Sequence, residues 1–152
     1  MAERLGNRML KLSLELISCC IKVGTHWSLG NRATSLLFLM PGIRNLERRR
    51  LYHSVVFDQC EFGLEDPVSH KRYKKATRVI SSFSLDSLRV RCSQDHEHEP
   101  VVGAVKVGNH WTRRSKLAGA YPWRLRVAWA RAIKLQLVTD HQHRCSRPKG
   151  GR

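Results

Sequence analysis

The sequence predicts a mixed α/β domain. Three observations predict it: apolar residues at helical spacing near the N-terminus, two β-branched runs in the middle, and a second helical pattern near the C-terminus. The chain has 152 residues, of which 41% are apolar, and this is enough for one domain with a modest core. We expect that domain to cover residues 1–138.

The first helix is predicted over residues 9–23, and Gly24 can end it. Its apolar stripe is formed by Leu10, Leu14, Ile17 and Ile21, widened by Leu12, Leu16 and Cys20. Residues 25–29 are aromatic and β-branched, and they predict a strand that runs into a turn at Gly30-Asn31. A loop follows, which Pro41-Gly42 interrupts.

The middle of the chain predicts a short helix over residues 43–51 and strands over 53–57 and 76–83. The basic cluster at residues 48–50 is interpreted as a solvated helix end. Asp58, Gln59 and Cys60 follow the first of these strands, where α/β sheets often carry functional groups. Residues 65–73 are predicted as a loop, and residues 84–88 as one helical turn capped by Ser84 or Asp86.

The C-terminal third begins with residues 91–100, which have no periodicity and are predicted to form a loop. Residues 101–107 predict a short strand, and residues 108–119 are basic and irregular. The last helix is expected to begin at Tyr121-Pro122, because proline suits the first helical turn. Leu125, Trp129, Ile133 and Leu137 share one face of it. Residues 139–152 are predicted to be a disordered basic tail.

The net charge of +16 is concentrated in the last third, where residues 101–152 hold 12 Lys and Arg against one Asp. Such a field attracts polyanions, and a nucleic-acid backbone fits it best because counterions are released on binding. An anionic membrane or ribosomal RNA would also satisfy the charge. The basic composition of a translated fragment without function is a further alternative.

Two basic clusters lie next to the aromatic residues Tyr73 and Trp111. Cations can hold phosphates while a neighbouring aromatic ring stacks on a base. The alternative for both clusters is a solvated basic loop. The candidate nucleic-acid-binding residues are Lys74, Lys75, Thr77, Arg113, Arg114 and Lys116.

Five cysteines form an odd set without the spacing of a disulfide framework, which favours a reducing compartment. The N-terminal region has no uninterrupted apolar run typical of a secretory signal, and no run reaches the length of about 20 residues that a bilayer requires. We therefore expect an intracellular protein, in the nucleus or cytoplasm, without membrane association.

The sharpest local pattern is Cys92-x3-His96-x-His98, with Cys60 as a fourth ligand from upstream. Two thiolates and two imidazoles suit tetrahedral zinc, which can order a loop that has little packing of its own. The alternatives are a polar loop with incidental histidines, and for Cys60 a core residue or a nucleophile. A second cluster in the tail, His141, His143 and Cys145, is a weaker candidate.

None of the Gly-rich phosphate loops or common hydrolase motifs is present in the sequence. A series of short motifs, however, resembles the C-terminal half of a DNA cytosine methyltransferase-like domain, of the kind also found in retrotransposon-type polyproteins. The motifs span about residues 25–135. They are Trp27–Arg32 with Ser35, Phe57–Gly63, Lys74–Thr77, Cys92 with His96 and His98, Gly103, and Tyr121-Pro122.

The resemblance implies a partial Rossmann-like (class I methyltransferase-like) sheet with flanking helices. In that family a strand carries a Glu-Asn-Pro motif whose glutamate assists protonation of the target base. Here Gly30, Asn31 and Arg32 form a degenerate version of the motif, with glycine in place of the glutamate. The family's S-adenosylmethionine loop and nucleophilic cysteine loop belong to the half that has no counterpart here, so we expect no catalytic residues and no S-adenosylmethionine site.

Three functions fit these observations. The first is a catalytically inactive methyltransferase-like remnant, of mobile-element origin, that keeps a basic nucleic-acid-binding surface and a structural zinc. The second is a non-catalytic RNA- or DNA-binding interaction module without metal. The third is a subunit that completes a methyltransferase together with a partner chain, which would also cover the open edge of an incomplete sheet.

Overall fold

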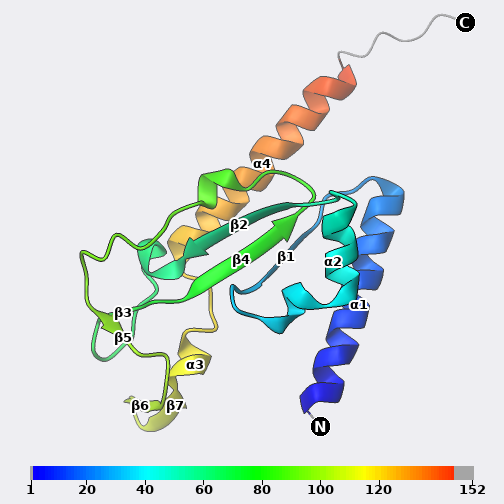
Figure 1. Ribbon diagram of the computed structural model, residues 1–152. Coiled ribbons are helices and arrows are strands. Elements are labelled where there is room, and N and C mark those ends of the chain that lie inside the picture. The colour runs from blue at the N-terminus through cyan, green and yellow to red at the C-terminus, as the bar shows by residue number, and fades with distance from the viewer. Residues whose placement is uncertain (1, 146–152) are drawn as a thin grey trace, which may run out of the picture. The chain divides into compact units, whose positions relative to one another are not determined.

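The computed structural model describes residues 2–145 and has a mixed α/β fold (Figure 1). This confirms the predicted fold class. In the described residues four α-helices accompany three small sheets. We predicted one domain over residues 1–138, whereas the contacts between residues divide the chain into two compact units. Unit 1 holds the described residues up to Phe57 together with Ala76–Arg89, and unit 2 holds Asp58–Lys75 and the described residues from Val90 onward.

Unit 1 begins with helix α1 (Ala2–Val23), which confirms the first predicted helix. The helix ends at Gly24, whose φ of 66° lies in the left-handed region that glycine adopts at low cost. Its buried stripe is narrower than predicted. Ile17 is buried, but Leu12, Leu16 and Ile21 are exposed.

The sheet of unit 1 has the strand order β1-β4-β2, formed by Ser28–Arg32, Ala76–Ser81 and His53–Asp58. The two central predicted strands are thus confirmed. β1 pairs with β4 in antiparallel orientation, with Gly30 opposite Val79 and Asn31 opposite Arg78. The predicted turn at Gly30-Asn31 is wrong, because ladder pairing with β4 extends the strand through both residues.

The connection between β1 and β2 is helical. A 3₁₀ turn, η1 (Leu36–Leu39), leads into α2 (Pro41–Arg48), where Pro41 occupies the first helical turn instead of interrupting a loop. The chain after β4 forms the short turn η3 (Asp86–Leu88), which confirms the predicted helical turn. The predicted cap is wrong, because Leu85 occupies the cap position and no side chain caps the turn; the Ser84 hydroxyl accepts a hydrogen bond from the Asp86 amide instead. One core cluster of unit 1 consists of Ile17, Trp27, Phe38, Ile43, Leu46 and Ile80.

Unit 2 is built from short elements. They are η2 (Gln59–Phe62), β3 (Arg72–Tyr73), β5 (His98–Glu99), β6 (Ala104–Val107), β7 (His110–Arg113) and α3 (Arg114–Leu117). β3 and β5 pair in parallel, whereas β6 and β7 form an antiparallel hairpin around Gly108-Asn109. The prediction that residues 108–119 are irregular is wrong, because Gly108, with a φ of 59°, allows a tight turn.

Helix α4 (Trp123–Cys145) begins directly after Pro122, as predicted. Leu125 is fully buried, but Ile133 and Leu137 on the predicted apolar face are exposed. The predicted start of the tail is wrong for residues 139–145, which are helical. Polar contacts suited to a helix support this last part, since Gln136 donates to Asp140 and the Thr139 hydroxyl donates to the Leu135 carbonyl. Residues 146–152 lie outside the described part.

Over residues 2–145, no helix has both the length and the apolar character needed to span a bilayer.

Candidate metal centre and basic surface

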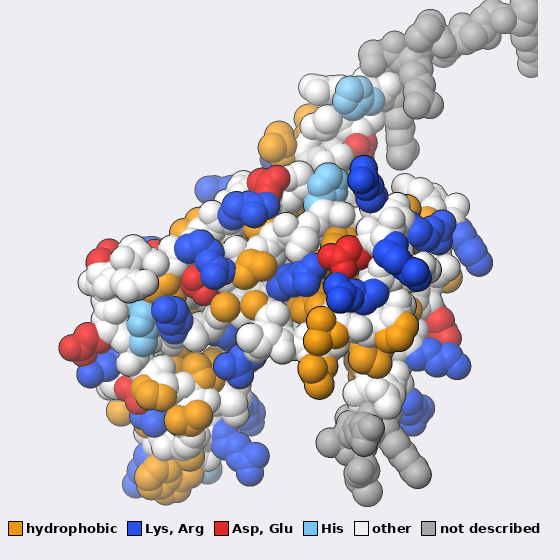
Figure 2. Space-filling model, viewed as in Figure 1, with side chains coloured by type: hydrophobic (Ala, Val, Ile, Leu, Met, Phe, Trp, Pro, Cys, Tyr) orange, Lys and Arg blue, Asp and Glu red, His pale blue; other side chains and the backbone are white. Residues whose placement is uncertain are grey.

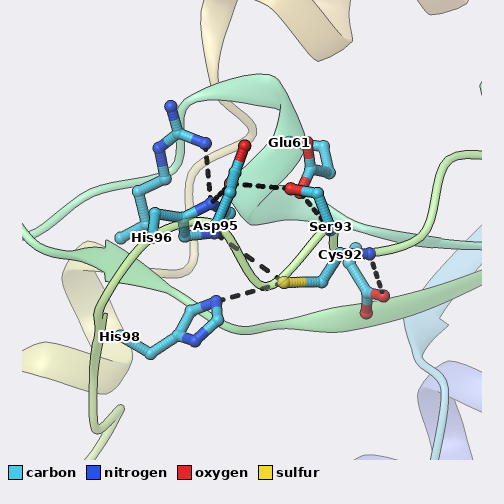
Figure 3. A network of polar contacts seen from close by, with 8 residues as sticks. Glu61, Cys92, Ser93, Asp95, His96 and His98 are labelled. Carbon is cyan, nitrogen blue, oxygen red and sulfur yellow. Dashed lines mark hydrogen bonds and ion pairs between the residues drawn. The ribbon is translucent and has the colours of Figure 1, made fainter.

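The four predicted metal ligands come together in unit 2. Cys60 lies on η2, Cys92 and His96 lie in the loop that follows Val90, and His98 begins β5. Their ligand atoms all lie within 4.8 Å of one another, so the group could hold a metal ion. Figure 3 shows the rings of His96 and His98 converging on the sulfur of Cys92. Residues separated by up to 38 positions thus form one cluster.

Backbone contacts bring these ligands together. The Asp58 amide donates to the Val90 carbonyl, and the Cys92 amide donates to Asp58 Oδ2 at 3.0 Å. The buried Asp58 carboxylate therefore ties the start of the loop to the residue just before η2. At the other end of the loop, His98 is held opposite Arg72 by the β3–β5 pairing.

The sulfur of Cys92 is the centre of the cluster. Its Sγ lies 3.4 Å from Nε2 of His98 and 3.8 Å from Nε2 of His96. The two imidazole rings have centroids 4.7 Å apart and meet edge to face at 68°. Cys60 is fully buried. Both histidines thus present the same nitrogen to the thiols.

A carboxylate orients the ring of His96. Its Nδ1 lies 2.6 Å from Asp95 Oδ1 and 3.1 Å from Arg72 Nη1. One ring nitrogen cannot donate to Asp95 and accept from Arg72 in the same tautomer. The shorter contact, with the carboxylate, favours a proton on Nδ1 and leaves the Nε2 lone pair directed at the cluster. Such a carboxylate–histidine pair is common behind metal-bound histidines.

Asp95 is itself held in place. The Ser93 hydroxyl contacts Asp95 Oδ1 at 2.7 Å and Glu61 Oε1 at 3.0 Å, and the Ser93 amide donates to the same Glu61 oxygen. Glu61, Asp95 and His96 also form a second group that could hold a metal ion. This second group uses atoms that already take part in these hydrogen bonds, so we assign it to the support of the four-ligand cluster.

Without a metal, the protonation of the cluster argues against catalysis by Cys60, and as a metal ligand Cys60 would have to release its proton when the metal binds. Burial, together with the neighbouring Cys92 thiol, raises the pKa of Cys60 to about 12. Burial and the charges of His96 and Lys74 lower the pKa of His98. Without a metal, Cys60 is therefore a protonated thiol, and this weakens the alternative that it is a nucleophile. A neutral His98 has the lone pair that a metal requires.

The weaker tail candidate is not assembled in the described residues. His141 and His143 lie on α4 and belong to no metal-binding group among the side chains that the structure describes. The side chain of Cys145 lies outside the described part of the chain.

Three of the six candidate nucleic-acid-binding residues have roles inside the fold. Lys75 donates to the Ala118 carbonyl at 2.6 Å and lies over the Tyr121 ring at 5.9 Å. Thr77 is buried on β4. Arg114 pairs with the carboxylates of Asp66 and Glu99, at 2.9 and 3.1 Å. The remaining three, Lys74, Arg113 and Lys116, are exposed.

Asp66 is a buried charge that the sequence did not reveal. Its oxygens accept hydrogen bonds from the Tyr73 hydroxyl at 2.5 Å, from Arg114, and from the backbone amides of Val68 and Ser69. Burial alone would raise the pKa of Asp66, but these hydrogen bonds outweigh it and hold the pKa well below its usual range. The carboxylate therefore stays charged and anchors the start of α3.

The β6–β7 hairpin adds one residue that sequence reasoning missed, Lys106. Lys106 lies directly opposite Trp111 in the ladder, and both side chains are exposed. The alternation of Val105, Lys106 and Val107 was the available signal for an outward-facing lysine. Over β6 and β7, at the lower left of Figure 2, hydrophobic and cationic side chains lie next to each other.

The degenerate motif Gly30-Asn31-Arg32 lies on β1, paired with β4. No protein-family model, curated protein or solved structure matches the chain.

Proposed function

We propose that the protein is a non-catalytic nucleic-acid-binding module in which a structural zinc ion stabilises unit 2. The observation that carries the proposal is the convergence of Cys60, Cys92, His96 and His98 in unit 2, the unit to which the basic C-terminal third of the chain also belongs. The zinc ion would fix the loop before the hairpin, and the exposed cations of the same unit would contact phosphates.

The spacing of the ligand atoms supports zinc. With Zn–S bonds of about 2.3 Å and Zn–N bonds of about 2.0 Å, tetrahedral geometry separates sulfur and nitrogen ligands by about 3.5 Å. The two Cys92–histidine separations, 3.4 and 3.8 Å, fall close to this value. Small shifts of the side chains would therefore bring these three atoms to bonding distance, and the sulfur of Cys60 lies within 4.8 Å of each of them.

A structural role fits the ligand set better than a catalytic role. Four protein ligands fill a tetrahedral shell, whereas catalytic zinc keeps one position open for water or substrate. Unit 2 also has a small core, in which Leu64, Tyr73 and Ala118 form a buried hydrophobic cluster. A unit of this kind gains much of its stability from a metal ion.

Nucleic acid is the proposed partner because of the distribution of charge. Residues 101–152 hold 12 Lys and Arg and one Asp, and Lys74, Arg113 and Lys116 present their side chains to solvent. Each cation that neutralises a phosphate releases a condensed counterion. Affinity should therefore fall steeply with salt.

Fluorescence anisotropy over a salt series tests this function. The triple variant Lys74→Gln, Arg113→Gln, Lys116→Gln should bind labelled nucleic acid more weakly, with the slope of log K against log salt reduced by about 2. The control is Lys11→Gln, Lys22→Gln, which removes two cations from α1. If the triple variant and the control lost the same binding affinity per cation removed, the result would contradict a localised binding surface. If the folded wild-type protein bound no nucleic acid, the result would contradict the proposed function.

The methyltransferase-like origin is part of the proposal. In it the β1-β4-β2 sheet is a remnant of a partial Rossmann-like sheet, and Gly30 takes the place of the glutamate that catalysis requires. Its support is the order of the motifs along the chain and the position of Gly30 on a strand. The expected result of a methyl-transfer assay with S-adenosylmethionine and DNA or RNA is no product.

Two further proposals concern the cellular location of the protein and a partner chain. The free cysteines among the described residues and the basic composition suit an intracellular location, in the nucleus or cytoplasm. A partner chain that completes the sheet would pair with the outer edge of β1 or β2. Light scattering would detect such a partner if it is a second copy of this chain.

A further inference from the structure

We propose that the outer face of the β6–β7 hairpin is a stacking platform for the unpaired bases of single-stranded nucleic acid. We call this surface the hairpin face and define it as Ala104, Lys106, Trp111 and Arg113. The inference rests on the proposed function and adds to it the form of nucleic acid that is bound and the residue that recognises it.

The ladder register places these residues on one side of the hairpin. Ala104 is opposite Arg113, and Lys106 is opposite Trp111. Cross-strand partners point to the same face, and alternate residues of each strand share that face. All four residues are exposed, whereas Val105, which belongs to the opposite face, is buried. The hairpin face is therefore the solvent side.

The chemistry of the hairpin face fits a nucleotide. Trp111 is 73% exposed, which is unusual for the largest aromatic side chain in a soluble domain. Lys106 lies across the ladder at about 5 Å, and Arg113 lies two residues along β7, at about 7 Å. An indole flanked by two cations can stack on a base while the cations hold the phosphates on either side.

The platform is anchored to the rest of unit 2. At the base of the hairpin the Arg114 amide donates to the Gly103 carbonyl at 3.1 Å. The Arg114 side chain reaches the buried carboxylate of Asp66 and the carboxylate of Glu99. Because these contacts fix the end of β7, the backbone that carries Trp111 and Arg113 is held before a ligand arrives, and binding costs less ordering entropy.

The platform favours single strands over duplexes. In a duplex each base is stacked on its neighbours, so its face is not accessible to a tryptophan ring. An unpaired base offers that face without an unstacking cost. The shared ligand chemistry is an unpaired base on a phosphodiester backbone, which both single-stranded DNA and RNA supply.

The test measures dissociation constants of the zinc-supplemented full chain by fluorescence anisotropy. The probes are 12-nucleotide oligo(dT), 12-nucleotide oligo(U), a 12-base-pair duplex, and vesicles of anionic phospholipid. The variants are Trp111→Ala, Trp111→Phe and Trp123→Ala. Trp123 is the matched control, because it is 69% exposed in the same unit but lies at the start of α4.

The wild-type protein should bind the oligonucleotides more tightly than the duplex. Trp111→Ala should weaken oligonucleotide binding by about 5- to 150-fold, the range for removal of one base-stacking aromatic residue. Trp111→Phe should recover most of the loss, and Trp123→Ala should bind like the wild type. Comparison of oligo(dT) with oligo(U) shows which single strand is preferred.

Two results would overturn the inference and leave the proposed function standing: a duplex affinity equal to that of single strands, or equal effects of Trp111→Ala and Trp123→Ala. Vesicle binding that depends on Trp111, without oligonucleotide binding, would assign the hairpin face to membranes and overturn both proposals. A folded wild-type protein that binds none of the nucleic acids would also overturn both.

Discussion

Replacement of Asp66 by asparagine removes a buried charge without a change in side-chain size. In the wild type Oδ1 accepts hydrogen bonds from the amides of Val68 and Ser69, and Oδ2 accepts them from Tyr73 and Arg114. Asparagine keeps the first oxygen but replaces the second with an NH₂ group. That group is a donor, so it cannot accept either bond, and it faces the Arg114 cation.

The expected loss follows from these contacts. A hydrogen bond to a charged group contributes about 1.5–3 kcal/mol to stability. Two such bonds are lost, but Arg114 can regain some hydration, so we expect Asp66→Asn to lower the free energy of unfolding by about 3 kcal/mol. For a chain of this size each kcal/mol corresponds to about 2–4 °C, which predicts a melting temperature lower by about 6–12 °C.

Circular dichroism during thermal unfolding measures this change. The control is Asp86→Asn, which removes an exposed carboxylate that pairs with Arg89 on the surface. Its melting temperature should fall by no more than about 2–4 °C, since an exposed ion pair contributes at most about 1 kcal/mol. If Asp66→Asn unfolds at the same temperature as the Asp86→Asn control, the buried network does not anchor unit 2 and the reasoning is refuted.

Three further predictions concern pH, backbone and metal. Because the pKa of Asp66 is lower in the folded than in the unfolded chain, its contribution to the free energy of unfolding is present above about pH 4 and is lost as the pH falls further. Urea unfolding should therefore show that the stability difference between wild type and Asp66→Asn shrinks below about pH 4. A difference that grew in this range would contradict the assignment. Gly63 has a φ of 80°, which a residue with a side chain adopts at a cost, so Gly63→Ala should destabilise the protein by about 1–2 kcal/mol. Gly6 lies within α1, where alanine is the better helix former, so Gly6→Ala should stabilise it by up to about 1 kcal/mol. Melting temperatures that change in the same direction in the two variants would contradict this. Addition of a zinc chelator should lower the melting temperature of the wild type but not that of a Cys92→Ser variant, and equal effects on the two would exclude a metal contribution.

The elements that the sequence predicted correctly are those with a strong local pattern. The periodic apolar residues of α1 and the β-branched runs of β2 and β4 determine their own structure. β1 was misplaced because Gly30-Asn31 has the composition of a turn. Its strand conformation comes from pairing with β4, which lies more than 40 residues away in the chain.

The candidate metal ligands could be predicted because cysteine and histidine have few other reasons to cluster. The partners that orient them could not. Asp95 resembled any other acidic residue of an exposed loop, and its role became visible only through its contact with His96. The basic residues were the hardest to assign, because composition does not distinguish Arg114, which pairs with Asp66, from the exposed Arg113.

The most direct test of the account is the metal content of the purified protein, measured by mass spectrometry. The wild type should contain about one zinc ion per chain, and the double variant Cys92→Ser, His98→Ala should contain none. The control Cys19→Ser, His110→Ala removes the same residue types outside the cluster and should keep its zinc. A well-folded wild-type protein without metal, or a double variant that retains zinc, would contradict the central claim.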